Sequence, residues 1–341
     1  MLEGAVQQTI VRDGIRLAIV SAGDPADATI VFVHGYPDTK EVWHPVMQRL
    51  AAEFRVIAYD VRGAGASSAP RGPQAYGFAA LGADLRSVLD AVAPGRPVHL
   101  VGHDWGAIQG WEFATAAAFD GRLASFTALA GPALGHAVTA SREPLRHGHV
   151  LAALGRLRRS WYILPLLTPG GPTVVWRVLL DRARWRQALQ WVERVPVDDE
   201  FPAATVVADG RHGANLYRRN LPPRALAAVG LPHARVPVQL IVPSGDRFIS
   251  DSYYEAAERI APGLRRRTVA GSHWAQRARP ALTAHWIGEF AREATAGQVR
   301  PGRRWRRGGG LEQLQGRLAL VTGAGSGIGR AAAVALAQRG A

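Results

Sequence analysis

Short apolar runs rich in β-branched residues recur in the first third of the chain, separated by turn residues and by stretches of helical spacing. The runs cover residues 15–20, 29–33, 55–59 and 98–101, and residues 81–92 carry a helical pattern. Strand signals return at residues 238–242 and 267–269. This alternation predicts an α/β fold, with a mostly parallel sheet and crossover helices.

A long segment without clear strands interrupts this pattern. Residues 131–223 are rich in Trp, Leu and Arg at helical spacing, and the segments on either side share one style of pattern. We therefore expect one α/β core in two parts, residues 1–130 and 224–294, with a helical insertion at 131–223. Residues 295–315 form a linker, because a Gly- and Arg-rich run buries too little apolar surface to fold. Residues 316–341 follow it as a separate βα segment.

The composition excludes several kinds of site and chemistry. The 341 residues include no cysteine, which excludes disulfides, thiolate metal sites and a Cys nucleophile. The formal net charge is +14, from 41 basic and 27 acidic residues, and Lys40 is the only lysine. A high pI alone does not indicate nucleic-acid binding, and we expect no nucleic-acid partner.

The N-terminal residues lack the basic stretch, apolar core and cleavage site of a secretory signal, so we expect a cytoplasmic protein. The most apolar long window, residues 161–180, contains several Pro and Gly residues and Arg177, which argues against a membrane span. The linker is expected to be a solvated tether, although its five arginines beside Trp305 leave a contact with acidic lipid or RNA open. The sequence gives no indication of the oligomeric state.

A turn between a strand signal and a helical stretch carries the first candidate for chemistry. It reads Gly102-His103-Asp104-Trp105-Gly106, the strand-turn-helix context of a nucleophile elbow, with Asp at the tip. A carboxylate that attacks an acyl carbon gives a labile anhydride, whereas attack on a saturated carbon gives an ester that a second step can hydrolyse. We therefore expect a substrate with an sp3 carbon and a leaving group, such as an epoxide or an alkyl halide.

Such a two-step reaction needs a base and a group that orients it. Asp246 follows one strand signal and His273 follows the next, in the nucleophile, acid, histidine order of α/β-hydrolases. The backbone N–H groups of Tyr36, in His34-Gly35-Tyr36-Pro37, and of Trp105 are candidates for an oxyanion hole. We expect neither a metal nor a redox cofactor for this chemistry.

Together these motifs and residues 60–67 (DVRGAGAS) make the chain similar to α/β-hydrolase-fold epoxide hydrolases from about residue 6 to residue 293. The resemblance implies that the insertion at 131–223 is a cap, and that two of its tyrosines bind and protonate the epoxide oxygen. Tyr217 matches one by its motif, and Tyr162 matches the other by its spacing to Pro169-Gly170. Aliphatic residues at 163–167 and 174–180 suggest an apolar pocket wall and a lipophilic epoxide.

Other interpretations remain open. Haloalkane dehalogenases share the Asp-His-Asp arrangement and the Trp after the nucleophile, and a relative without catalysis is a second alternative. Among the remaining residues, we expect His103 to pack behind the elbow and His34 to bond a neighbouring loop. We also expect residues 60–67 to form a braced loop in which Asp and Arg pair locally. The cap tryptophans are expected to belong to the core; they are Trp176, Trp185 and Trp191.

The last segment resembles the opening of a short-chain dehydrogenase/reductase. A strand signal at residues 318–321 leads into a Gly-rich turn and a helical stretch, the pattern that holds a dinucleotide pyrophosphate. The resemblance implies a fusion of an epoxide hydrolase to a reductase that would bind NAD or NADP only if complete. The residues implied in this incomplete motif are Gly323, Ser326, Gly327, Ile328 and Gly329.

Overall fold

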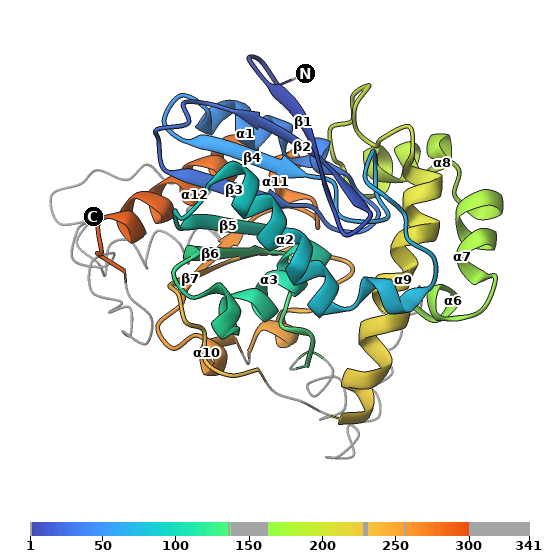
Figure 1. Ribbon diagram of the computed structural model, residues 1–341. Helices are drawn as coiled ribbons and strands as arrows, with labels where there is room; N and C mark the ends of the chain where they lie inside the picture. The colour runs from blue at the N-terminus through green and yellow to red at the C-terminus, as the bar shows by residue number, and fades with distance from the viewer. Residues whose placement is uncertain (1, 136, 138–162, 228–230, 256, 300–341) are drawn as a thin grey trace, which may run out of the picture. The chain divides into compact units, whose positions relative to one another are not determined.

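Eight strands form one sheet in the order β1-β2-β4-β3-β5-β6-β7-β8 (Figure 1). They are β1 (Val6–Arg12), β2 (Ile15–Ala22), β3 (Thr29–Val33), β4 (Arg55–Tyr59), β5 (Val98–His103), β6 (Leu123–Leu129), β7 (Val238–Pro243) and β8 (Arg265–Val269). The β1–β2 and β2–β4 pairs are antiparallel and the other neighbouring pairs are parallel. The predicted mostly parallel α/β sheet is confirmed. The sequence pattern missed β1, an edge strand in which no residue is fully buried and Ile10 is only partly buried against the core.

The computed structural model describes residues 2–135, 137, 163–227, 231–255 and 257–299. Its helices, 3-10 turns and π-helical turns are η1 (Lys40–Trp43), α1 (His44–Leu50), η2 (Pro73–Tyr76), α2 (Phe78–Val92), α3 (Trp105–Thr115), η3 (Ala117–Phe119), α6 (Ile163–Leu167), α7 (Gly171–Val174), η4 (Val175–Leu179), α8 (Arg182–Gln187), η5 (Ala188–Val192), α9 (Val206–Ala227), η6 (Asp251–Tyr254), α10 (Ala257–Ile260), α11 (Ala275–Ala278) and α12 (Pro280–Thr295). None of the helices within this part of the chain combines the length and the hydropathy needed to cross a bilayer.

The central strand β3 shows how the sheet is covered on both faces. All five of its residues are buried. Val31 and Val33 pack in the cluster that contains the apolar residues of α2 and α3. Ile30 and Phe32, which point to the opposite face, pack in the cluster that contains those of α1 and α12. A strand buried on both faces reads as a continuous apolar run, which explains why the sequence revealed it clearly.

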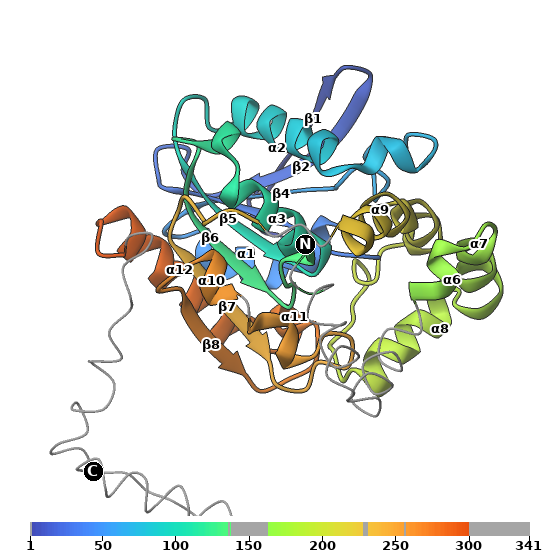
Figure 2. The same cartoon turned by 90° about the horizontal axis from the view of Figure 1, so that it is seen from below.

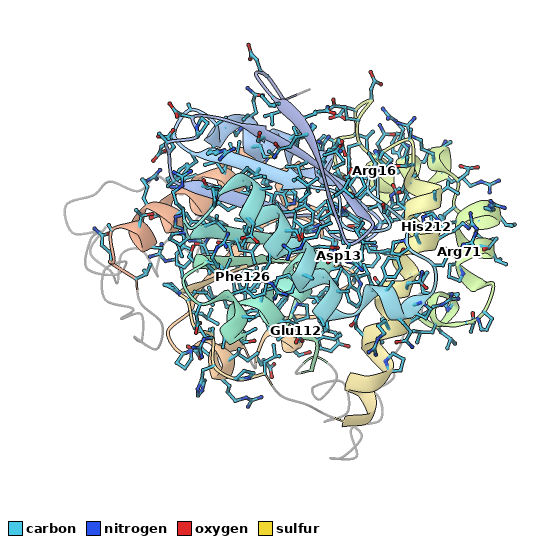
Figure 3. All side chains as sticks on the ribbon, in the orientation of Figure 1. Asp13, Arg16, Arg71, Glu112, Phe126 and His212 are labelled. Atoms are coloured by element: carbon cyan, nitrogen blue, oxygen red, sulfur yellow. The ribbon has the colours of Figure 1, made fainter. Side chains whose placement is uncertain are left out.

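The segment between β6 and β7 contains only helical elements in its described part, α6 to α9. In both Figure 1 and Figure 2, α6, α7 and α8 lie beyond α9, on the side away from the sheet. Helix α9 contacts the core directly: Asn220 Nδ2 donates to the carbonyl of Tyr76 at 3.0 Å. In Figure 3, His212 of α9 and Arg71, just before η2, both lie on the side of the core that faces α9. The inserted helices are therefore positioned by α9.

The loop after β4 is braced, as expected, but by other partners. Asp60 accepts hydrogen bonds from Lys40 Nζ at 2.8 Å and from the N–H of Ala66 at 3.0 Å. Arg62 forms a bidentate pair with Asp84 of α2, with both distances at 2.6 Å. The expected local Asp60–Arg62 pairing is wrong, because each of these buried charges finds an opposite charge on another element.

Candidate active site

Asp104 lies at the tip of a sharp turn between β5 and α3. Its backbone has φ 48° and ψ −118°, a conformation that costs about 1–3 kcal/mol for a residue other than glycine. Two glycines permit the turn by allowing close approach. A Cβ on Gly106 would lie 2.1 Å from the carbonyl oxygen of Val33, and one on Gly35 would lie 2.5 Å from Cβ of Asp104. The geometry is that of the nucleophile elbow predicted from the sequence.

The two carboxylate oxygens of Asp104 have different partners. Oδ1 accepts a hydrogen bond from the backbone N–H of Tyr36 at 2.9 Å. Oδ2 lies 3.5 Å from Nε2 of His273. Trp105, the second expected N–H donor, is the first residue of α3, where backbone N–H groups have no acceptor within the helix. The carboxylate is thus held by one oxygen and faces the histidine with the other.

His273 is held from its other side by Asp246. The distance from Nδ1 to Oδ2 of Asp246 is 2.8 Å. The second oxygen of Asp246 accepts from the N–H groups of Phe248 and Ile249, at 2.8 and 2.9 Å, which fixes the carboxylate. Burial alone would lower the pKa of His273, but the charges of Asp246 and Asp104 raise it well above its ordinary value. The structure therefore brings the three residues selected from the sequence into one array.

Buried polar residues lie behind this array. His103 is fully buried, as expected, and its Nε2 lies 3.2 Å from the carbonyl oxygen of His273. Burial, together with the nearby charge of His273, lowers the pKa of His103 to about 3, so its ring is neutral. Asp38 accepts from the indole N–H of Trp274 at 2.8 Å, and burial raises its pKa to about 7. Asp38 was not predicted from the sequence, although its position directly after the His34–Pro37 segment was a usable signal.

His34 binds its neighbouring segments as expected. Its Nδ1 lies 2.8 Å from the carbonyl oxygen of Gly35, and its Nε2 accepts from the N–H of Val61 at 2.9 Å. Since one nitrogen faces an acceptor and the other a donor, the neutral ring with hydrogen on Nδ1 satisfies both. Burial also lowers the pKa of His34. This histidine joins the loops after β3 and β4.

The inserted helices α6 to α9, called the cap below, bring aromatic side chains to the residues around the array. Tyr217 of α9 is buried, and its ring centroid lies 4.8 Å from that of Trp105 and 5.2 Å from that of Tyr36. The hydroxyl of Tyr36 accepts from the indole N–H of Trp176 at 2.5 Å and donates to the carbonyl of Gly210 at 2.9 Å. Tyr162 lies outside the described residues. The Tyr36 side chain thus connects the loop after β3 to η4 and α9 of the cap. The sequence motif had indicated a role only for the backbone N–H of Tyr36.

The structure shows which tryptophans and aliphatic residues of the cap are buried. Trp176 is buried and Trp185 is partly buried, but Trp191 is 81% exposed, so its assignment to the core is wrong. Within the aliphatic stretches expected to line a pocket, Leu166 is buried whereas Leu164 is 69% exposed. Apolar character without a clear period did not show which side chains point inward.

Glu193 is a buried carboxylate beside the array that sequence analysis missed. It directly follows η5 and is 7% exposed, and its Oε1 lies 3.7 Å from Nε of Arg247. Burial raises its pKa, while the charge of His273 acts in the opposite direction. A single Glu in an Arg-rich segment gives no indication from the sequence that its side chain is buried beside the array.

Comparison with known proteins places the chain in a family. The model of the alpha/beta hydrolase fold family matches residues 28–280, and the chain belongs to this family. Among solved structures, an epoxide hydrolase from Bacillus megaterium superposes with a TM-score of 0.69 at 21% identity, covering 84% of this chain and all of that one. Epoxide hydrolase A from Mycobacterium thermoresistibile gives a TM-score of 0.64 at 24% identity, covering 84% of this chain and 98% of that one. These likenesses confirm the α/β-hydrolase fold.

Particular relatives are similar in sequence as well. A protein from Mycobacterium tuberculosis named "Probable oxidoreductase EphD" is 35% identical over 341 residues, which is 96% of this chain and 57% of that protein. "Epoxide hydrolase A" from Mycobacterium tuberculosis is 38% identical over 135 residues, 39% of this chain and 41% of that protein. The chain thus spans little more than half the length of the first of these relatives.

Proposed function

We propose that the chain is an epoxide hydrolase that opens a lipophilic epoxide to a vicinal diol through an ester on Asp104. The observation that carries this proposal is the position of the Asp104 carboxylate, with Oδ1 bonded to the Tyr36 N–H and Oδ2 facing His273. The names of the similar proteins support the same substrate class. A carboxylate nucleophile also favours a saturated carbon over an acyl carbon, because only the former gives a stable ester.

In the first step Oδ2 of Asp104 attacks an epoxide carbon, the carbon–oxygen bond of the ring breaks, and the ring oxygen takes a proton. We assign the acid to Tyr217, which lies against Trp105, and to Tyr162, which lies outside the described residues. The Tyr36 hydroxyl is not assigned this role, since it already bonds Trp176 and Gly210 and burial raises its pKa. A hydrogen-bonded acid is needed because an alkoxide is a poor leaving group.

In the second step His273 removes a proton from water, which attacks the carbonyl carbon of the ester. Negative charge then forms on Oδ1, where the Tyr36 N–H already donates, and the Trp105 N–H is assigned as the second donor. The bond from the carbonyl carbon to the product oxygen then breaks, and this oxygen takes the proton back from His273 as the diol leaves. Esterification removes the charge of Asp104, and this lowers the pKa of His273 toward the range of a useful base. Formation of the ester thereby prepares the base for the next step.

The proposal extends to residues 316–341, which lie outside the described residues. We propose that they begin a short-chain dehydrogenase/reductase domain that binds NAD or NADP, and that the hydrolase needs no cofactor. The relative named a probable oxidoreductase matches 96% of this chain and is longer than it, which supports a fused reductase. A cytoplasmic location likewise remains a proposal.

The test compares two substrates and one variant. Wild type and Tyr217→Phe are incubated with 1,2-epoxydecane and with 1-bromodecane, and diol and bromide are measured. We expect diol but no bromide from the wild type, and about 100-fold slower diol formation from Tyr217→Phe, the scale of a lost general acid. Bromide release by both proteins would instead assign dehalogenase chemistry. Absence of both products from folded protein would indicate a relative without catalysis.

A further inference from the structure

Exposed apolar side chains concentrate on the outer helices of the cap. Nine large apolar residues are exposed in the part of the chain that the structure describes, and six of them fall between residues 164 and 192. We call these six the cap patch; they are Leu164, Val174, Val178, Leu179, Trp191 and Val192. Such a concentration on one segment differs from the scattered exposed apolar residues that ordinary surfaces carry.

The cap patch is displayed on the outside of the molecule. Leu164 belongs to α6, and Val174 and Val178 lie one helical turn apart where α7 continues into η4. Figures 1 and 2 both show α6, α7 and α8 outside α9, away from the sheet. In Figure 3 the side chains of these helices project from that edge. The exposed apolar side chains of α6 and α7 are therefore carried on helices that lie away from the sheet.

Basic residues outnumber acidic ones in the segment that carries the patch, although the exposed Asp198 and Asp199 lie beside Arg186 and Arg182, which donate to their carbonyls. Residues 163–192 contain four arginines and a single acidic residue, Asp181. Arg177 has no hydrogen-bond or ion-pair partner among the described residues and is exposed. Arg184 donates to the carbonyl of Val178 at 2.6 Å, which holds its charge at the patch, and its Nε lies 3.8 Å from Asp181.

We propose that the cap patch docks on an anionic lipid surface. Aliphatic side chains and an exposed Trp on an arginine-rich segment form the combination that lies in a membrane interface, where apolar groups enter the acyl boundary and basic groups meet anionic headgroups. A second copy fits less well, since a two-fold interface would bring two arginine-rich patches together. Docking by the cap would bring the enzyme to the phase in which a lipophilic epoxide dissolves.

The experiment measures co-sedimentation of the 341-residue chain with vesicles. Vesicles of phosphatidylcholine with phosphatidylglycerol are compared with vesicles of phosphatidylcholine alone, at low and high salt. The test variants are Leu179→Ser/Trp191→Ser and Arg177→Glu. The matched control is Val6→Ser/Val11→Ser, which removes two exposed apolar residues from β1. Circular dichroism and turnover of a short water-soluble epoxide check that each variant is folded.

We expect the wild type and the β1 control to bind the anionic vesicles equally and to lose binding at high salt. The affinity of the Leu179→Ser/Trp191→Ser variant for anionic vesicles should fall about tenfold or more, and that of Arg177→Glu several-fold. Unchanged binding by the patch variants would overturn the proposal and assign any lipid affinity to arginines elsewhere. A wild-type dimer that the double variant converts to monomer, without vesicle binding, would overturn it in favour of a self-interface.

Discussion

The bridge that the Tyr36 hydroxyl forms between core and cap leads to a measurable loss of stability. Tyr36→Phe removes the acceptor of the Trp176 indole N–H and the donor to the Gly210 carbonyl, but keeps the ring against Tyr217 and the backbone N–H at Asp104. Trp176 is 2% exposed, so its N–H is left buried without that partner. Leaving a buried donor unsatisfied costs about 1–3 kcal/mol, and we expect a loss of about 2 kcal/mol.

The assay is urea unfolding followed by Trp fluorescence and by far-UV circular dichroism, with coincident transitions as the check on two-state behaviour. A double-mutant cycle with Trp176→Phe should give a coupling energy of about 1–2 kcal/mol. Tyr253→Phe, at a partly exposed residue of η6, is the matched control and should change stability by less than about 0.5 kcal/mol. A loss in Tyr36→Phe no larger than in this control would refute the role of the bridge.

Three further predictions concern the elbow and the histidine. Gly106→Ala places a Cβ 2.1 Å from the Val33 carbonyl oxygen and should lower the free energy of unfolding in urea by at least ~3 kcal/mol. The control Gly77→Ala, whose Cβ meets only ordinary contacts, should leave stability nearly unchanged. Equal effects of the two substitutions would contradict the close approach at Gly106. Asp246→Asn should lower the kcat for diol formation about 10⁴-fold without a change in fold, and a loss under tenfold would speak against its orienting role. Since the folded-state pKa of His273 is raised, its contribution to stability is full below its unfolded pKa and is lost as pH rises through the folded value. The difference in unfolding free energy between wild type and His273→Gln should therefore be larger at pH 6 than at pH 10, and a constant difference would show that the pKa is not raised.

The sequence predicted features that depend on local pattern. The β3 run was recognisable because both faces of the strand are buried, and the elbow was recognisable because close backbone contacts require Gly102 and Gly106 at fixed positions around Asp104. Chain order then located Asp246 and His273, since the ends of neighbouring parallel strands meet at one edge of a sheet. These constraints are short in sequence and follow from the geometry of the fold.

Features that depend on contacts between distant segments were not predictable. Arg62 pairs with Asp84 of α2, 22 residues away, where sequence proximity had suggested Asp60. Trp191 and Trp176 both belong to the helical insertion, yet one is exposed and the other bonds Tyr36, 140 residues away. Burial of a cap residue is decided by the tertiary arrangement of short helices, which hydrophobic periodicity over four or five residues does not encode.

The mass of the protein after incubation with an epoxide shows whether Asp104 is the nucleophile. His273→Gln removes the base and should stop the reaction after ring opening, so that incubation with 1,2-epoxydecane raises the protein mass by one epoxide. Peptide analysis should place the added mass on Asp104, and the double variant Asp104→Asn/His273→Gln should show none. Diol formation without any adduct on Asp104, or an adduct on another residue, would contradict the assignment of Asp104 as the nucleophile.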